Sequence, residues 1–131
     1  DRVRDRGEVF TAEREVKAMC DLIPAEVWDD IGSAFLEPAC GNGNFLAEIM
    51  ARKYGRCRDV SDGLRALRSL TAIDILPDNV IESRMRLYKQ FFDRFPQAGP
   101  ADLLEAESIL GQNIICGDSL KIMKEWSEDV E

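Results

Sequence analysis

A glycine-rich corner at residues 37–44, EPACGNGN, and two later carboxylates are the residues best suited to bind a ligand. Gly41 and Gly43 allow the backbone to turn tightly and to approach a ligand without a side-chain clash. Asp74 directly follows an apolar run, where a carboxylate can accept both hydroxyl hydrogens of a ribose. Asp118, in the segment CGDSL, can accept a hydrogen bond from an exocyclic amine. Together these groups have the chemistry that a nucleoside requires.

Each of these features also has a purely structural explanation. A Gly-x-Gly turn between a strand and a helix is often only a tight turn. An aspartate after a strand is frequently a turn residue or a helix N-cap, and Asp118-Ser119 could begin a helix. The ligand interpretation is favoured because all three features are expected at the same end of one sheet.

Two other nucleotide sites fit the sequence poorly. A dinucleotide fingerprint needs a glycine or alanine three residues after Gly43, but Leu46 occupies that position. A phosphate-binding P-loop needs a Gly-Lys-Ser/Thr triplet, and the sequence contains none.

The elements that must position these residues alternate between helix and strand. Apolar spacing predicts helices over about 12–22, 24–30, 44–54, 78–95 and 101–110. The helix at 78–95 has the strongest repeat, which consists of Ile81, Met85, Tyr88, Phe92 and Phe95. Strands are predicted in AFLEPA (34–39), LTAIDI (70–75) and NIICGDSL (113–120). Residues 56–69 stay undecided, and the tail after 120 is either helical or frayed.

This order predicts an α/β fold with a parallel sheet flanked by helices. Ligands of such sheets bind beyond the carboxyl ends of the strands. We call that margin the rim; it should contain residues 37–44, Asp74 and Asp118.

Composition narrows the class of protein. The chain has 131 residues, of which 45% are hydrophobic and 32% charged, as in one globular domain. No apolar run approaches the roughly 20 residues that cross a bilayer, so no membrane partner is expected. Acidic residues outnumber basic ones 25 to 17, which disfavours unaided nucleic-acid binding. The basic stretches 1–6 and 52–58 are interpreted as solvated surface, with phosphate contact as the alternative.

Cysteine usage indicates no metal site or disulfide framework. The four cysteines form no CxxC pair and histidine is absent, so no metal ligands are predicted. We expect buried or inert thiols and a reducing, cytoplasmic location.

Four segments in this order, RGEVFTAE, FLEPACGNGNFL, AIDILPDNV and IICGDSL, resemble the opening motifs of bacterial restriction-modification adenine-specific DNA methyltransferases. The resemblance covers roughly residues 6–120, and EPACGNGNF is its most specific part. It implies a Rossmann-like methyltransferase fold, here with the first three strands only, that binds S-adenosylmethionine.

The resemblance also implies roles for individual residues. Phe10 and Thr11 match the segment near the methionine end of the cofactor, in a helical region at 1–34 that precedes the sheet domain at 35–131. The loop under the methionine and sulfonium matches Glu37, Pro38, Ala39, Cys40, Gly41, Asn42 and Gly43. Asp74 matches the ribose-binding acid and Ile75 the apolar residue beside the adenine. Asp118 matches the acceptor of the adenine amine, with Ser119 and Leu120 beside it.

The sequence departs from the family in three places. Ala12 stands where many relatives have proline, and Glu37 stands in place of aspartate. The family's catalytic signature, Asn or Asp followed by Pro-Pro and an aromatic residue, is missing, because no two of the five prolines are adjacent. No catalytic residue is therefore assigned, and we expect the 131 residues to be an inactive, cofactor-binding portion of a larger enzyme.

The expected partners follow from that interpretation. DNA should contact parts outside this sequence, and a restriction or specificity subunit is a further candidate. The first strand should form an exposed edge, which favours self-association unless residues 1–34 or 121–131 cover it. Two alternatives remain: a methyltransferase for RNA, protein or small molecules, and a non-catalytic S-adenosylmethionine-binding or interaction module.

Overall fold

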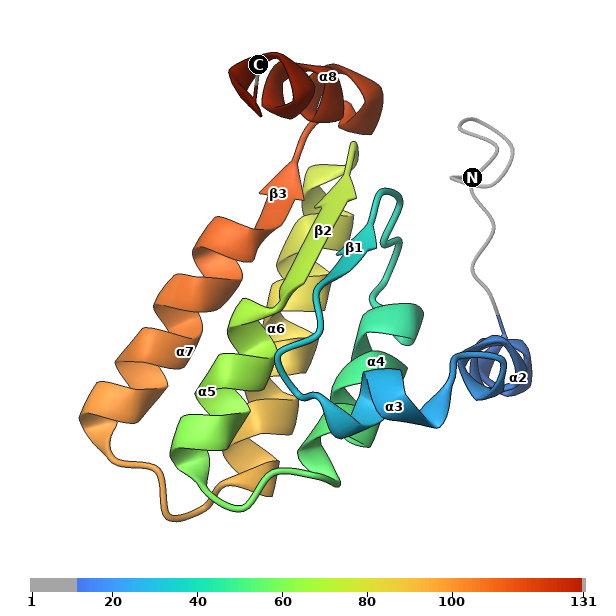
Figure 1. Cartoon of the computed structure of the whole chain (residues 1–131). Helices are drawn as coiled ribbons and strands as arrows, with labels where there is room; N and C mark the ends of the chain where they lie inside the picture. The colour runs from blue at the N-terminus through green and yellow to red at the C-terminus, as the bar shows by residue number, and fades with distance from the viewer. Residues whose placement is uncertain (1–11, 131) are drawn as a thin grey trace.

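The computed structural model describes residues 12–130, which form an α/β fold around a three-stranded parallel sheet (Figure 1). The strands are β1 (Phe35–Glu37), β2 (Leu70–Asp74) and β3 (Ile114–Cys116), in the spatial order β1-β2-β3. In the parallel register, Leu36 lies opposite Thr71 and Ile73 lies opposite Ile115. All three strands fall inside the segments predicted from the sequence.

Helices connect and extend the strands. Their bounds are α2 (Glu13–Asp21), α3 (Ala25–Asp29), α4 (Asn44–Tyr54), α5 (Val60–Arg68), α6 (Pro77–Arg94), α7 (Pro100–Asn113) and α8 (Ser119–Val130). Prolines at the first positions of α6 and α7 begin those helices without losing a hydrogen bond. The undecided region at 56–69 contains α5, whose N-cap Asp59 accepts a hydrogen bond from the Asp62 N–H at 2.9 Å.

The hydrophobic core lies on one face of the sheet. Helices α4 and α6 pack together on that face, behind the strands in the view of Figure 1. The residues buried between them include Leu46, Met50, Leu70, Ala72 and Leu87. Leu46, Ile49 and Met50 are buried and Phe45 is partly buried, so these residues form the inner face of α4.

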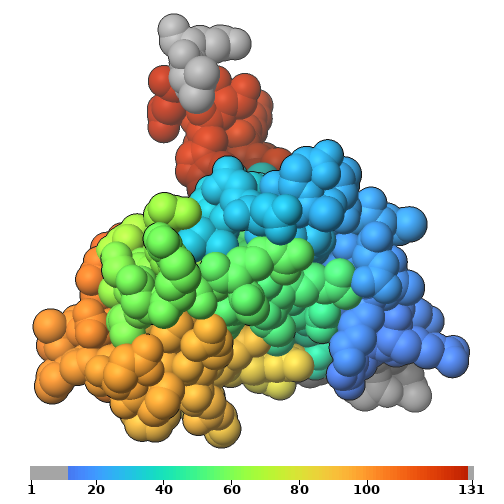
Figure 2. All heavy atoms as spheres, turned by 60° about the horizontal axis from the view of Figure 1, so that its bottom comes forward, coloured from blue at the N-terminus to red at the C-terminus, as the bar shows by residue number. Residues whose placement is uncertain are grey.

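The opposite face of the sheet has far less cover. Leu36, Thr71 and Ile115 border a hollow of about 480 Å³ on that side, and Leu36 is 45% exposed. Among residues 12–130, strand β1 pairs only with β2, so the prediction that the first strand forms an edge is confirmed. Helix α8 stands out from the body of the molecule, as Figure 2 shows, and none of its described side chains is buried.

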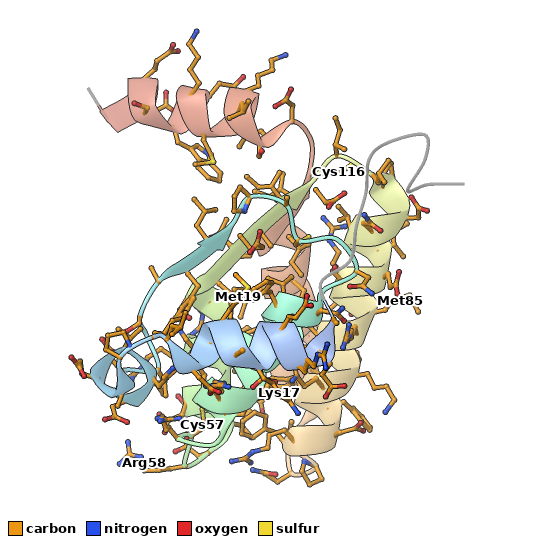
Figure 3. All side chains as sticks on the ribbon, turned by 90° about the vertical axis from the view of Figure 1, so that its right-hand side faces the viewer. Lys17, Met19, Cys57, Arg58, Met85 and Cys116 are labelled. Atoms are coloured by element: carbon orange, nitrogen blue, oxygen red, sulfur yellow. The ribbon has the colours of Figure 1, made fainter. Side chains whose placement is uncertain are left out.

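The repeat that identified α6 lies largely on the exposed side of that helix, although Tyr88 is partly buried against the core and Phe95, just past the end of the helix, is buried. Ile81, Met85 and Phe92 are 55%, 67% and 53% exposed, and Figure 3 shows Met85 on the outer side of the helix. The face that packs inward consists of Asn79, Val80, Ser83, Leu87 and Phe91. In α2, Val16 and Cys20 are buried, whereas Met19 is exposed.

Two smaller predictions concern charge and membranes. The basic stretch 52–58 is largely neutralised by acids: Arg52 pairs with Glu48 and Asp21, and Arg56 pairs with Asp29. These ion pairs favour the interpretation as ordinary surface. No helix within residues 12–130 is long and apolar enough to cross a membrane. The basic stretch 1–6, Phe10 and Thr11 lie outside the described residues.

Candidate functional site

The glycine-rich loop folds into the turn that the sequence predicts. Gly41 has a φ of 54° and Gly43 a φ of 91°, a region that side chains with a Cβ atom rarely adopt. A Cβ atom on Gly43 would also lie 3.1 Å from Ser83 Oγ. Between them, Asn42 Oδ1 accepts a hydrogen bond from the Asn44 N–H, and α4 begins at Asn44. The two glycines are therefore required by backbone geometry.

Asp74 holds this loop against the neighbouring strand. Its Oδ2 accepts a hydrogen bond from the Gly41 N–H at 2.9 Å. Its Oδ1 accepts from the Leu76 N–H at 2.9 Å and from Asn79 Nδ2 at 3.1 Å. Because a carboxylate offers about four acceptor positions, three protein donors leave little capacity for a second task. A ribose would have to displace a donor or share one of these oxygens.

Two buried polar residues of α6 complete the support of the loop. Asn79 donates to Asp74, as above, and the Ser83 hydroxyl donates to the Gly41 carbonyl oxygen at 3.1 Å. Both residues are 0% exposed. Apolar periodicity does not reveal these two residues, because both are polar. The sequence does contain a signal for them: two polar side chains lie four residues apart, just after a strand that ends in an acid.

Glu37 lies at the start of the loop, at the end of β1. It is half-buried, and its Oε1 accepts a hydrogen bond from the Ala39 N–H at 3.1 Å. Burial raises the pKa of the Glu37 carboxyl group, and the hydrogen bond from Ala39 opposes that rise. Pro38 and Ala39 are exposed, whereas Cys40 is buried.

Asp118 lies at the start of a helix, which is the structural explanation considered above for Asp118-Ser119. Its Oδ1 accepts hydrogen bonds from the N–H groups of Leu120 at 3.0 Å and Lys121 at 3.3 Å, at the start of α8. Ser119 is the first residue of that helix. Asp118 is nevertheless exposed, so its second oxygen faces solvent or a ligand.

Backbone contacts join the three segments at one rim. The Cys40 N–H donates to the Ile73 carbonyl oxygen, and the Gly117 N–H donates to the Asp74 carbonyl oxygen, both at 2.9 Å. Ile75 and Leu120 follow β2 and β3 and are 59% and 81% exposed. The rim thus combines carboxylates with two exposed apolar side chains.

The rim is open rather than enclosed. None of the four hollows described among residues 12–130 is lined by Glu37, Asp74 or Asp118. In the same range, no salt bridge involves these three acids, and no cluster of three potential metal ligands occurs. The arrangement suits hydroxyl and amine donors better than a phosphate group, which needs basic partners.

The four thiols divide into three buried and one exposed. Cys20, Cys40 and Cys57 are buried, and burial raises the pKa of each, that of Cys40 to about 11. Cys116, labelled in Figure 3, is exposed, so burial accounts for three of the four thiols that were expected to be buried or inert.

We expect a thiol reagent such as dithionitrobenzoate to modify one cysteine rapidly at pH 8 and all four after unfolding. The fast reaction should disappear in Cys116→Ser, because the other thiols are shielded and remain protonated. Cys57→Ser is the matched control and should leave the fast phase intact. Rapid modification of two or more native thiols would contradict the burial described here.

Comparison with known proteins gives no independent assignment: no family model, no curated protein and no solved structure matches the chain.

Proposed function

We propose that this chain is the S-adenosylmethionine-binding portion of a DNA adenine methyltransferase of a restriction-modification system. One observation carries the proposal: the EPACGNGN loop caps the end of a parallel strand and is held by the acid that ends the next strand. The 2.9 Å hydrogen bond from the Gly41 N–H to Asp74 links those two motifs directly. The motif supplies the choice of cofactor, and the geometry supports it by placing the matching segments at one rim.

Each segment of the rim has a task in this proposal. Asp74 accepts hydrogen bonds from the ribose hydroxyls, with one oxygen shared between the ribose and the loop. The exposed side chains of Ile75 and Leu120 pack against the two faces of the adenine. Asp118 accepts a hydrogen bond from the adenine amine through the oxygen that does not cap α8. The loop at 37–43 holds the methionine end.

The chemistry assigned to this chain is binding and positioning. S-adenosylmethionine supplies a methyl group that is already activated on a sulfonium. A large part of the rate then comes from holding the methyl group in line with the acceptor nitrogen. A target adenine must also be flipped from the duplex and held by its amino group. The sequence contains no Asn/Asp-Pro-Pro-aromatic segment for that task, so the 131 residues should be inactive by themselves.

Calorimetry with the purified chain tests the proposal. S-adenosylmethionine and S-adenosylhomocysteine should bind with one site per chain, and NAD should not bind. The absence of heat and of a thermal shift with millimolar S-adenosylmethionine would contradict the proposal. Binding without methylation of DNA by the larger protein would favour a methyltransferase of another substrate class or a non-catalytic module.

Gly41→Val provides the variant arm of this test. Valine resists a φ of 54° at a cost of roughly 1–2 kcal/mol. Its side chain would also fill the space in which the loop backbone approaches the cofactor. Binding should fall at least tenfold. Gly111→Ala is the matched control, because Gly111 lies in α7 with no atom within 4 Å of an added Cβ. Its affinity should equal that of the wild type, and retained binding in Gly41→Val would show that the loop is only a turn.

A further inference from the structure

We infer that the open face of the sheet, together with the apolar face of α8, is an interface between two copies of this chain. The inference goes beyond the proposed cofactor site, because it concerns the uncovered face of the sheet rather than the rim at the strand ends. The surface consists of the residues around the 480 Å³ hollow, and we call it the open-face patch: Ala34, Phe35, Leu36, Ser69, Thr71, Gln112, Asn113, Ile115 and Trp126.

The open-face patch is uncharged. None of the nine residues of the open-face patch is charged, although 32% of the whole chain is charged and its net charge is −8. A nucleic acid or a strongly charged peptide would find no complementary group there. Two acidic copies, in contrast, can meet at an uncharged surface without placing like charges in contact.

The chain also carries an apolar surface that matches the open-face patch. Helix α8 places Ile122, Met123 and Trp126 on one stripe, because their spacing follows the helical repeat. These three side chains are only partly covered or exposed, and Trp126 is 38% exposed. Charged residues such as Lys121, Lys124 and Glu125 lie on the remaining faces. An amphipathic helix with this pattern normally packs its apolar stripe against another surface.

The open-face patch and the apolar stripe of α8 lie next to each other. Trp126 of α8 borders the same hollow as Leu36 and Ile115 of the sheet. One protomer therefore presents this hollow and, beside it, the apolar stripe of α8. Figure 2 shows α8 projecting from the body of the molecule. A two-fold axis would place each α8 on the sheet face of the partner, which is the self-complementary contact that a symmetric dimer requires. Parallel sheets also have both faces covered in nearly all known folds, and a dimer would supply the missing cover.

Another apolar hollow is less suited to this role. The hollow of about 630 Å³ between α6 and α7 is lined by Ile81, Met85 and Leu110, but also by Arg84 and Glu107. No other unpaired apolar helix borders it. Its exposed Met85 therefore serves as the control position for the test.

Sedimentation velocity of the full chain over about 1–300 µM measures the interface. We expect a concentration-dependent species of twice 14.8 kDa. Because apolar contact is opposed by repulsion between two acidic chains, raising the salt from 50 mM to 500 mM should strengthen the dimer. A mass of 14.8 kDa at every concentration, or dissociation by salt, would overturn the inference.

Single substitutions locate the interface. Leu36→Lys and Trp126→Gln should each weaken the dimer at least tenfold, while circular dichroism shows a folded chain. Met85→Lys changes an exposed apolar side chain outside the open-face patch and should leave the dimer constant unchanged. If Met85→Lys dissociates the dimer and Trp126→Gln does not, the interface lies on α6 and the inference is wrong.

Discussion

Asp74→Ala is expected to abolish detectable S-adenosylmethionine binding and to lower the free energy of unfolding by about 3 kcal/mol. The carboxylate accepts hydrogen bonds from the Gly41 N–H, the Leu76 N–H and Asn79 Nδ2, and the residue is only 9% exposed. Alanine removes all three acceptors at once. Hydrogen bonds to a charged group contribute about 1.5–3 kcal/mol each, and nearby water can replace part of them.

Asp74→Asn separates the two roles of this side chain. The amide oxygen can still accept from Leu76 and Asn79, but an amide nitrogen then faces the Gly41 N–H, where two donors meet. We expect the loop to be released, with a stability loss smaller than that of alanine and an affinity loss that is nearly as large.

Urea unfolding and calorimetry on the same samples give both quantities. Glu82→Ala, an exposed acid on α6, is the matched control and should change neither. Equal affinity of wild type and Asp74→Asn would show that Asp74 neither binds the cofactor nor positions its loop. A stability change within 0.5 kcal/mol in Asp74→Ala, a typical size for surface substitutions, would contradict the three hydrogen bonds.

The sequence predicted the fold well where local patterns coincide with tertiary structure. The three strands are short apolar runs that end at turn residues, and the structure places them in one parallel sheet. The glycine-rich loop was predictable because a positive φ is a property of the local backbone. These features depend on neighbours along the chain rather than on distant contacts.

Local patterns failed where a helix has two apolar stripes. In α6, one stripe contains Ile81, Met85 and Phe92, and the other contains Leu87 and Phe91. The first stripe is longer, but only the second faces the sheet. Periodicity cannot distinguish them, because it does not register hydrogen bonds to distant groups. Asn79 donates to the Asp74 carboxylate and Ser83 to the Gly41 carbonyl oxygen, and both bonds require these polar residues on the inward face.

Lys53 is the clearest residue for which the sequence predicts an exposed side chain and the structure shows a buried one. It belongs to the basic stretch 52–58, yet it is 0% exposed. Its Nζ donates hydrogen bonds to the carbonyl oxygens of Ile31 and Ser33 and to Ser69 Oγ. The ammonium group also lies 4.8 Å from the centre of the Phe35 ring. Its three donors therefore connect the segment before β1 to the residue before β2.

Lys53→Met should destabilise the protein by about 2–4 kcal/mol at pH 7, since buried acceptors lose their donors. Methionine fills a similar volume, so the loss reports on hydrogen bonds rather than on a cavity. The desolvation of a buried ammonium opposes this effect, and neutral substitution of buried charges is sometimes harmless. We expect the loss of hydrogen bonds to outweigh the relief of desolvation, because all three donors of the Lys53 ammonium group have partners.

The pH dependence provides a second and sharper test. Burial lowers the pKa of Lys53 from 10.5 to about 8, and the nearby Asp30 only partly opposes this. Between about pH 8 and 10.5 the unfolded chain therefore binds more protons at this site than the folded chain. Stability from this group consequently rises with pH across that window, by at most about 1.4 kcal/mol per pH unit.

The difference between wild type and Lys53→Met isolates that contribution. Burial raises the pKa of the Cys40 thiol and of Tyr54, so both proteins lose stability from these groups in alkali, which cancels in the difference. The cost of the substitution should therefore be larger at pH 9.5 than at pH 7. Urea unfolding at both pH values measures it, with Lys89→Met, a 78% exposed lysine, as the control expected to stay within 0.5 kcal/mol. A cost that is constant or falls with pH would mean that Lys53 keeps its proton in the folded protein, and that its ammonium is better solvated than its complete burial indicates.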